Sequence, residues 1–182
     1  MPTLYTYITT SLTFTVTYSC SLISLFMPEW LRFESPRPYK TITNYGLFQK
    51  CSTLNDVKCR DFPSIDYGDC EEERFCEEWN TARNAMIFAA VIGGLTLIYC
   101  IIVLLSGGSH HKHAWKVFVA LLQISSIALI THLYFTSNQF LYGVRFDNSY
   151  FLSTGSSVVN FILSLILFFF GRSFRPSYEP IG

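Results

Sequence analysis

The chain has 182 residues, and its 13 basic and 13 acidic side chains give a formal net charge of zero. Half of the residues are hydrophobic, 17% are aromatic and only 14% are charged, against about 25% charged residues in ordinary soluble domains. Averaged over the chain, this composition does not by itself separate a soluble domain from a membrane protein, so the distribution of the charges has to decide. We expect no nucleic-acid partner and no cofactor.

The charged residues are segregated along the chain, and four long stretches contain no Asp, Glu, Lys or Arg. A bilayer core needs about 20 apolar helical residues, so each stretch is long enough to cross it. A soluble four-helix bundle would show polar faces at the helical period, and these stretches do not. The sequence therefore predicts four membrane spans, at residues 7–27, 86–106, 117–136 and 151–170.

The alternative to the first span is a signal peptide, which has a basic beginning and an apolar core of about 7–15 residues. Residues 1–28 contain no Lys or Arg, and their apolar and hydroxyl run is too long for such a core, so a retained span is favoured. Hydroxyl side chains recur in it at helical spacing, which is typical of a face packed on other helices. They are Thr9, Thr13, Thr17, Ser21 and Ser24.

The segment 28–85 between the first two spans is too long for a simple connector and too short for an independent hydrophobic core. Small units of this kind usually need staples, and four of the six cysteines lie here. Three pairings are possible, and the shortest loops favour Cys51 with Cys59 and Cys70 with Cys76. The alternating run 39–48 predicts one or two strands, and 71–84 predicts a helical lead-in to the second span.

The orientation of the chain follows from its basic residues and its cysteines. The short loop 107–116 and the tail 171–182 each carry two Lys or Arg, which fits the cytoplasmic side. The segment 28–85 carries eight, which argues the other way, but it also carries eleven acidic residues and approaches the length at which the rule loses force. An even number of cysteines in a polar segment indicates an oxidising compartment. We therefore expect both termini in the cytoplasm and 28–85 outside.

A spaced motif in that outer segment consists of Trp30, Gly46-Leu47-Phe48, Cys51 and Cys59. It resembles the first extracellular loop of the claudin and peripheral-myelin-protein tetraspan superfamily, with Phe48 in place of a Trp. The run from Trp79 to Met86, which includes Arg83, is similar to the start of the second span in claudins. The chain is most similar to fungal claudin-like membrane proteins, which share three further elements: Lys58-Cys59-Arg60-Asp61-Phe62-Pro63, Phe75-Cys76-Glu77-Glu78-Trp79, and Ser106-Gly107-Gly108 with Trp115-Lys116-Val117.

The resemblance implies a single tetraspan domain over 1–182. Its fold would be an all-α transmembrane four-helix bundle with a small extracellular antiparallel β-sheet. Trp30 and 46–48 would lie at the membrane-facing edge of the sheet, Arg83 would contact the same corner, and the bond between Cys51 and Cys59 would be part of the motif. The C-terminal residues 180–182 lack the Tyr-Val ending by which many claudins engage junction scaffolds, so anchoring at tight junctions is not implied.

Few side chains are candidates for chemistry. His110, His111 and His113 lie in a short inner loop without Cys or carboxylate partners, so a weakly basic loop is favoured over a metal site. His132 is the only ionisable side chain that we place inside a predicted span. Ionisable groups within the membrane are functional candidates, but a histidine near a helix end can simply reach the interface. An intramembrane hydrolase or proton-coupled carrier needs several buried polar groups, so we expect neither a metal nor enzymatic activity.

The leading functional interpretation is a non-enzymatic plasma-membrane tetraspan that organises membrane or cell-surface contacts through its outer segment. Its partners would be the lipid bilayer and homo- or hetero-oligomeric membrane proteins. The alternative is an ion channel or a channel-modulating subunit, in which the acidic run 71–73 attracts cations near a pore. The same run is also explained as a solvated helix start, where carboxylates complement the helix dipole.

Overall fold

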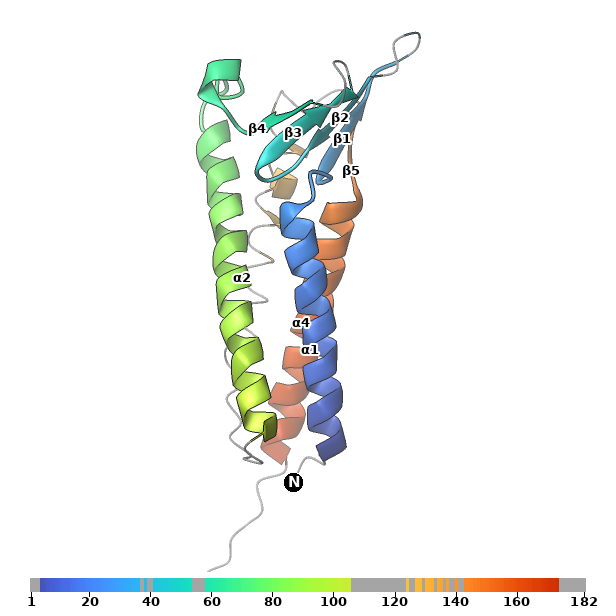
Figure 1. Ribbon diagram of the computed structural model, residues 1–182, viewed down its shortest axis with the longest axis vertical. Helices are drawn as coiled ribbons and strands as arrows, with labels where there is room; N and C mark the ends of the chain where they lie inside the picture. Colours follow the sequence, from blue (N-terminus) through green and yellow to red (C-terminus); the bar gives the residue numbers. More distant parts are fainter. Residues whose placement is uncertain are drawn as a thin grey trace, which may run out of the picture.

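The computed structural model describes residues 4–36, 38, 41–53, 58–105 and 143–173, with 124, 127–128, 130–132, 134–135, 137 and 140. Three long helices, α1 (Leu4–Phe26), α2 (Phe75–Leu105) and α4 (Asn148–Ser173), run along the length of the molecule, with a small sheet at one end (Figure 1). The start of α1 and the end of α4 lie at the opposite end.

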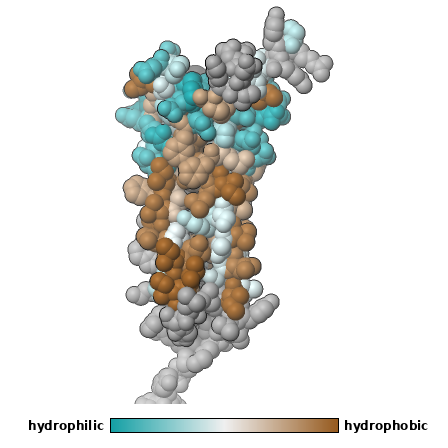
Figure 2. All heavy atoms as spheres, viewed as in Figure 1, coloured by the Kyte–Doolittle hydropathy of each residue, from teal (hydrophilic) through white to brown (hydrophobic). Residues whose placement is uncertain are grey.

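Each of the three helices contains a stretch that is long and apolar enough to cross a membrane. These stretches are Ile8–Phe26, Phe75–Ile102 and Asn148–Ile166. Figure 2 shows hydrophobic residues along the helices and hydrophilic residues gathered at the sheet end. The chain is therefore a membrane protein, and the polar residues of its described part gather at the sheet end of the helices.

The fold class expected from the sequence is confirmed in part: the chain has apolar helices and a small antiparallel sheet, here of five strands. It is wrong in one respect, because the chain is not an all-α four-helix bundle, and three spanning helices are found among the described residues. Most of the predicted span 117–136 lies outside the described residues, and those that are described between 124 and 135 are helical. The predicted loop 107–116, with its three histidines, and the tail after Ser173 also lie outside them.

Helix α2 begins at Phe75, well before the predicted span start at position 86. Its first turn carries Glu77 and Glu78, which complement the positive end of the helix dipole. With 31 residues and a rise of about 1.5 Å per residue, the helix is roughly 46 Å long, which exceeds a hydrocarbon core of about 30 Å. One end of α2 therefore extends beyond the bilayer, and the lead-in predicted over 71–84 is largely this extension.

Helix α1 packs against both α4 and α2 through small and hydroxyl side chains. The Thr17 hydroxyl donates a hydrogen bond to the Asn160 side-chain oxygen of α4 at 2.6 Å. The hydroxyl of Tyr18 donates to the carbonyl of Ala90 in α2 at 2.8 Å, and its ring fills the space beside Gly93. Most other hydroxyls at these interfaces donate to the carbonyl one turn earlier in their own helix. Of the predicted hydroxyl stripe, Thr17, Ser21 and Ser24 are buried in the packed face, whereas Thr9 is exposed.

The sheet has five short strands: β1 (Leu31–Glu34), β2 (Ile42–Tyr45), β3 (Gln49–Ser52), β4 (Lys58–Asp61) and β5 (Val144–Phe146). Their order is β4-β3-β2-β1-β5, and all neighbours are antiparallel. Strand β1 pairs with β2 on one side and with β5, which directly precedes α4, on the other. Within its described residues 41–48, the predicted run 39–48 contains one strand, β2, and the turn that follows it, and β5 was not predicted.

The main core lies where the sheet meets the helices. It is formed by buried side chains from both: Leu25, Trp30, Leu31, Leu47, Phe62, Phe75, Trp79, Ala82, Met86, Ile130, Phe140 and Val144. Several of its aromatic rings meet edge to face, such as Phe62 and Trp79, whose centroids are 5.1 Å apart. Such pairs add about 0.5–1.5 kcal/mol each beyond area burial. The sheet is thus packed onto the helix ends.

Candidate functional site: the disulfide-stapled cap

The candidate site is the polar end of the molecule, which we call the cap: strands β1–β5 together with the segment 62–74. Trp30 joins it to α1. The indole nitrogen of Trp30 donates to the Ser24 carbonyl at 2.8 Å. The backbone N–H of Trp30 donates to Tyr45 at 3.0 Å, and its carbonyl accepts from Asp147 at 3.1 Å. With no exposed surface, Trp30 ties the end of α1 into the sheet.

The Gly46-Leu47-Phe48 turn packs against the chain just after α1. A Cβ added to Gly46 would lie 2.6 Å from the Cα of Pro28, so only glycine allows this close approach. Leu47 is buried, and its carbonyl accepts a hydrogen bond from the indole nitrogen of Trp79 at 3.4 Å. The turn is therefore fixed between the end of α1 and the first turns of α2.

Phe48, the third residue of that turn, stacks on Phe26, the last residue of α1. Their ring centroids are 6.1 Å apart with an interplanar angle of 13°. The Arg83 guanidinium of α2 lies over the Phe48 ring, with its Cζ 5.6 Å from the ring centroid. We call Phe26, Phe48 and Arg83 the ladder. It brings α1, the sheet and α2 together at one corner, so Arg83 lies next to the motif turn.

Two disulfides staple the cap. Cys51 and Cys59 face each other across β3 and β4 and are bonded. Cys70 and Cys76 join the segment after β4 to the first turn of α2. This is the connectivity that the shortest loops favoured.

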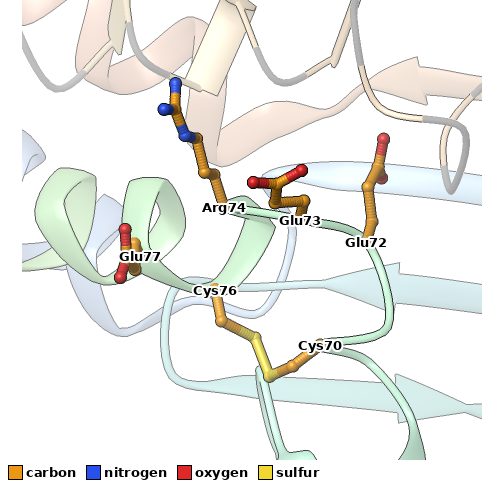
Figure 3. Close-up of a pocket in the computed structure, with 6 residues that line it drawn as sticks. All are labelled: Cys70, Glu72, Glu73, Arg74, Cys76 and Glu77. Carbon is orange, nitrogen blue, oxygen red and sulfur yellow. A yellow bond between two sulfur atoms is a disulfide. The ribbon is translucent and has the colours of Figure 1, made fainter.

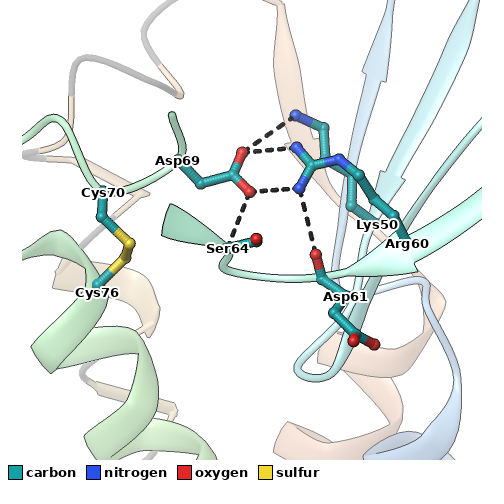
Figure 4. Close-up of a disulfide and its surroundings, with 7 residues drawn as sticks. All are labelled: Lys50, Arg60, Asp61, Ser64, Asp69, Cys70 and Cys76. Atoms are coloured by element: carbon teal, nitrogen blue, oxygen red, sulfur yellow. Dashed lines mark hydrogen bonds and ion pairs between the residues drawn. A yellow bond between two sulfur atoms is a disulfide. The ribbon is translucent and has the colours of Figure 1, made fainter. Parts of the chain in front are cut away.

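A buried ion pair holds the segment between the two disulfides (Figure 4). Both oxygens of Asp69 accept hydrogen bonds from Arg60, at 2.5 and 2.7 Å. The backbone N–H of Ser64 donates to the same carboxylate at 3.1 Å, and the Lys50 ammonium lies 3.8 Å away. Since only 5% of the Asp69 side chain is exposed, this fork-to-fork pair is the charge-assisted kind that fixes geometry.

The ion pair changes the pKa values of its members. Burial alone would raise the pKa of Asp69, but the hydrogen bonds from Arg60 and Ser64, together with the positive charges of Arg60 and Lys50, hold that pKa below its ordinary value. Burial lowers the pKa of Lys50, against the opposing effect of Asp69. The hydrogen bond to Asp69 raises the pKa of Arg60. Only the shift of Lys50 follows from burial itself, since burial disfavours the charged form of every group, whereas the shifts of Asp69 and Arg60 come from the pairing between them.

A short 3-10 helix, η2 (Ile65–Tyr67), presents apolar side chains to the outside. Ile65 is 83% exposed and Tyr67 is 67% exposed. The Arg60 guanidinium lies 4.5 Å from the Tyr67 ring centroid, and Gly68 closes the turn with a φ of 73°. The residues directly after this turn are fixed by the Asp69 ion pair and by the Cys70–Cys76 bond. The backbone that carries these apolar side chains is therefore held in place. Sequence reasoning missed them, since a turn rich in Ser, Asp and Gly predicts only a polar loop.

The acidic run lines a shallow depression of about 370 Å³, formed by Cys70, Glu72, Glu73, Arg74, Cys76 and Glu77. In Figure 3 the side chains of Glu72, Glu73 and Arg74 point to the same side, away from the disulfide. The Ser137 hydroxyl donates to the Glu72 carboxylate. The run is thus divided between a structural carboxylate, Glu72, and exposed ones, Glu71 and Glu73.

The histidines that the sequence singled out, and any metal site, can be compared with the structure in part. His132 is 60% exposed, and its Nδ1 lies 3.5 Å from a Glu78 carboxylate oxygen, at the level of the extramembrane turns of α2. The histidines of 107–116 lie outside the described residues. Within the part of the chain that is described, no three His, Cys, Asp or Glu side chains are grouped as metal ligands.

Comparison with known proteins adds nothing to this geometry: no protein-family model matches the chain, and no curated protein is found to be similar to it.

Proposed function

We propose that the chain is a claudin-like tetraspan of the plasma membrane that organises membrane or cell-surface contacts through its cap, without enzymatic activity. Both termini would lie in the cytoplasm, and the cap would lie outside, within a homo- or hetero-oligomeric assembly. Three apolar helices under a disulfide-bonded sheet support this class of protein. The position of Trp30 and the 46–48 turn at the junction of sheet and helices supports it further.

The observation that carries the proposal is the exposure of Ile65 and Tyr67 on η2. Single exposed apolar residues are common on protein surfaces, but here two large ones share one turn and the turn is held by an ion pair and a disulfide. A preorganised apolar protrusion loses little conformational freedom when a partner covers it. A protein contact surface fits these features better than a substrate site does, because η2 protrudes and does not enclose a ligand.

The test replaces the two apolar side chains together, as Ile65→Ser and Tyr67→Ser, and measures cross-linking of the chain to its neighbours at the cell surface. We expect cross-linking to fall several-fold while surface delivery stays normal, because substitutions at such exposed sites change stability by about 0.5 kcal/mol or less. Asp66→Asn on the same turn is the matched control. Unchanged cross-linking of the double variant contradicts a contact role for η2.

Orientation is tested separately, with an epitope tag at each terminus and external protease on intact cells. We expect both tags to be protected while the cap is cleaved or labelled. Digestion of either tag from outside contradicts the proposed topology.

An ion channel or a channel-modulating subunit is the second candidate, and the exposed carboxylates Glu71 and Glu73 beside the acidic depression favour it. Neutralising them as Glu71→Gln and Glu73→Gln should change conductance or ion preference if this candidate is correct. Glu72 is left intact in this experiment because its carboxylate binds Ser137. Unchanged conductance, together with altered clustering, favours the organiser.

A further inference from the structure

Arg83 occupies the boundary between the polar and apolar parts of α2. It is the last charged residue before a stretch of the helix without Asp, Glu, Lys or Arg up to Leu105. A charge near the bilayer centre costs about 2.5–3.5 kcal/mol on insertion scales, so the helix is expected to hold Arg83 at the depth of the lipid headgroups. Exposed apolar side chains follow directly, with Ile87 and Phe88 37% and 62% exposed.

Arg83 has no anionic partner within the described part of the chain. Three other arginines there, Arg32, Arg60 and Arg145, each pair with a carboxylate. The positions three and four residues from Arg83 along the helix are its neighbours on the helix surface, and they hold Trp79, Asn80, Met86 and Ile87. The local sequence of α2 therefore provides no counter-charge for this guanidinium.

The ladder places the guanidinium of Arg83 over an aromatic ring. A guanidinium over an aromatic ring interacts through its flat face, and its N–H donors lie in the plane of the group. The Cζ of Arg83 lies 5.6 Å from the centroid of the Phe48 ring, and Phe48 is itself stacked on Phe26. Phe26 is 68% exposed, so the ladder presents an apolar surface beside a cation that pairs with no carboxylate among the described residues.

We propose that Arg83 binds the phosphate of a phospholipid in the leaflet on the cap side, with Phe26 and Phe48 packed against the apolar part of the same lipid. The planar fork of arginine matches two phosphate oxygens at once. A headgroup phosphate is the anion that a bilayer supplies at this depth. The inference needs only that the helices cross a membrane, so it does not depend on the organiser function.

The test uses the full-length chain in an uncharged detergent, with short-chain phosphatidylglycerol as the probe and native mass spectrometry as the readout. Arg83→Gln should weaken lipid binding roughly tenfold, as expected for the loss of a charge-assisted hydrogen-bonded pair. The lipid affinity of Arg83→Lys, which keeps the charge but not the planar fork, should lie between that of the unchanged chain and that of Arg83→Gln. Arg74→Gln is the matched control, since it removes the same charge from the cap away from the ladder, and it should bind as the unchanged chain does.

Two further ligands identify what the site recognises. Diacylglycerol with the same acyl chains lacks the phosphate and should bind at least tenfold more weakly. Inorganic phosphate in tenfold excess over the lipid should not displace it, because the ladder also contacts the apolar part. Displacement by inorganic phosphate would assign the site to a free anion and overturn the proposal, and equal binding of diacylglycerol would overturn it too.

Folding of each variant is checked by gel filtration and by intact mass, which reports both disulfides. If Arg83→Gln does not fold, Phe48→Leu tests the same site, because it keeps the arginine and removes the ring beneath it, and it should weaken binding about threefold. Unchanged affinity of a folded Arg83 or Phe48 variant, or an equal loss in Arg74→Gln, overturns the proposal.

Discussion

The indole nitrogen of Trp30 donates its hydrogen bond to the carbonyl of Ser24, in the last turn of α1, at 2.8 Å. The last four carbonyls of a helix have no partner within it, so a buried one needs a donor from elsewhere. Both residues are fully buried, and water cannot replace the indole there. Trp30 therefore satisfies the C-terminal end of α1, and it is also a core residue where the sheet meets the helices.

Replacing Trp30 with Phe should destabilise the folded chain by about 2–4 kcal/mol, because it leaves a buried carbonyl unsatisfied and removes ring volume. Chemical denaturation in detergent micelles measures this loss. Ser24→Ala is the control, since it keeps the carbonyl acceptor and should cost about 1 kcal/mol. Equal losses in the two variants would show that the indole hydrogen bond contributes little.

Loss of the Cys51–Cys59 bond should cause retention in the secretory pathway. Closure of so short a loop contributes roughly 2–3 kcal/mol by the loop-entropy estimate, and the four-residue strands it joins have little core of their own. Replacing both cysteines should be no worse than replacing one, and substitutions of Cys20 or Cys100 within the helices should be milder. Normal surface delivery of Cys51→Ser, or free thiols at both positions by intact mass, contradicts this prediction.

The ion pair between Arg60 and Asp69 predicts a loss of cap stability in acid. The pKa of Asp69 is lower in the folded chain than its ordinary value, so the unfolded chain takes up the proton first as the pH falls. The contribution is therefore complete above about pH 4, the ordinary pKa of an aspartate, and is lost as the pH falls through the lowered folded value.

Asp69→Asn should remove this acid-dependent step and cost about 2–3 kcal/mol at neutral pH, because it leaves the partly buried Arg60 without its partner. Denaturation of the cap followed by tryptophan fluorescence across this pH range measures both effects. Asp66→Asn, an exposed change on η2, should leave the acid profile intact. An unchanged profile in Asp69→Asn would mean that other carboxylates cause the acid loss.

Gly93→Ala should destabilise the contact between α1 and α2 by about 1–3 kcal/mol, because the added Cβ would lie 2.6 Å from the Tyr18 ring and overpack it. Gly155→Ala in α4 is the matched control, since nothing lies within 4 Å of its added Cβ, and it should be neutral or slightly stabilising. Combining Gly93→Ala with Tyr18→Leu should cost less than the sum of the two single changes. Additive costs in this double-mutant cycle would contradict direct packing.

The sequence predicts those parts of the fold that depend on local pattern. Uncharged apolar runs identify the spanning helices, and short cysteine separations favour the two disulfides. Strand β5 could not be predicted, because three residues, Val144–Phe146, give no alternation and their partner β1 lies over 100 residues away. The Arg60–Asp69 pair was missed for a similar reason, since charges in an irregular segment carry no periodic signal. Of the ladder, only the approach of Arg83 to the motif was expected, and that came from the resemblance and not from the pattern.

The pairing of β1 with β5 also determines when the sheet can be completed during translation. Leu31 pairs with Phe146, so one edge of β1 stays open until the ribosome has added 115 further residues. At about 5–20 residues per second, that interval is roughly 6–23 s. Cys51, Cys59, Cys70 and Cys76 are all made earlier, so both staples can close on a four-stranded sheet. During this interval the nascent chain exposes an unpaired strand edge, which is a template for wrong pairing with other chains.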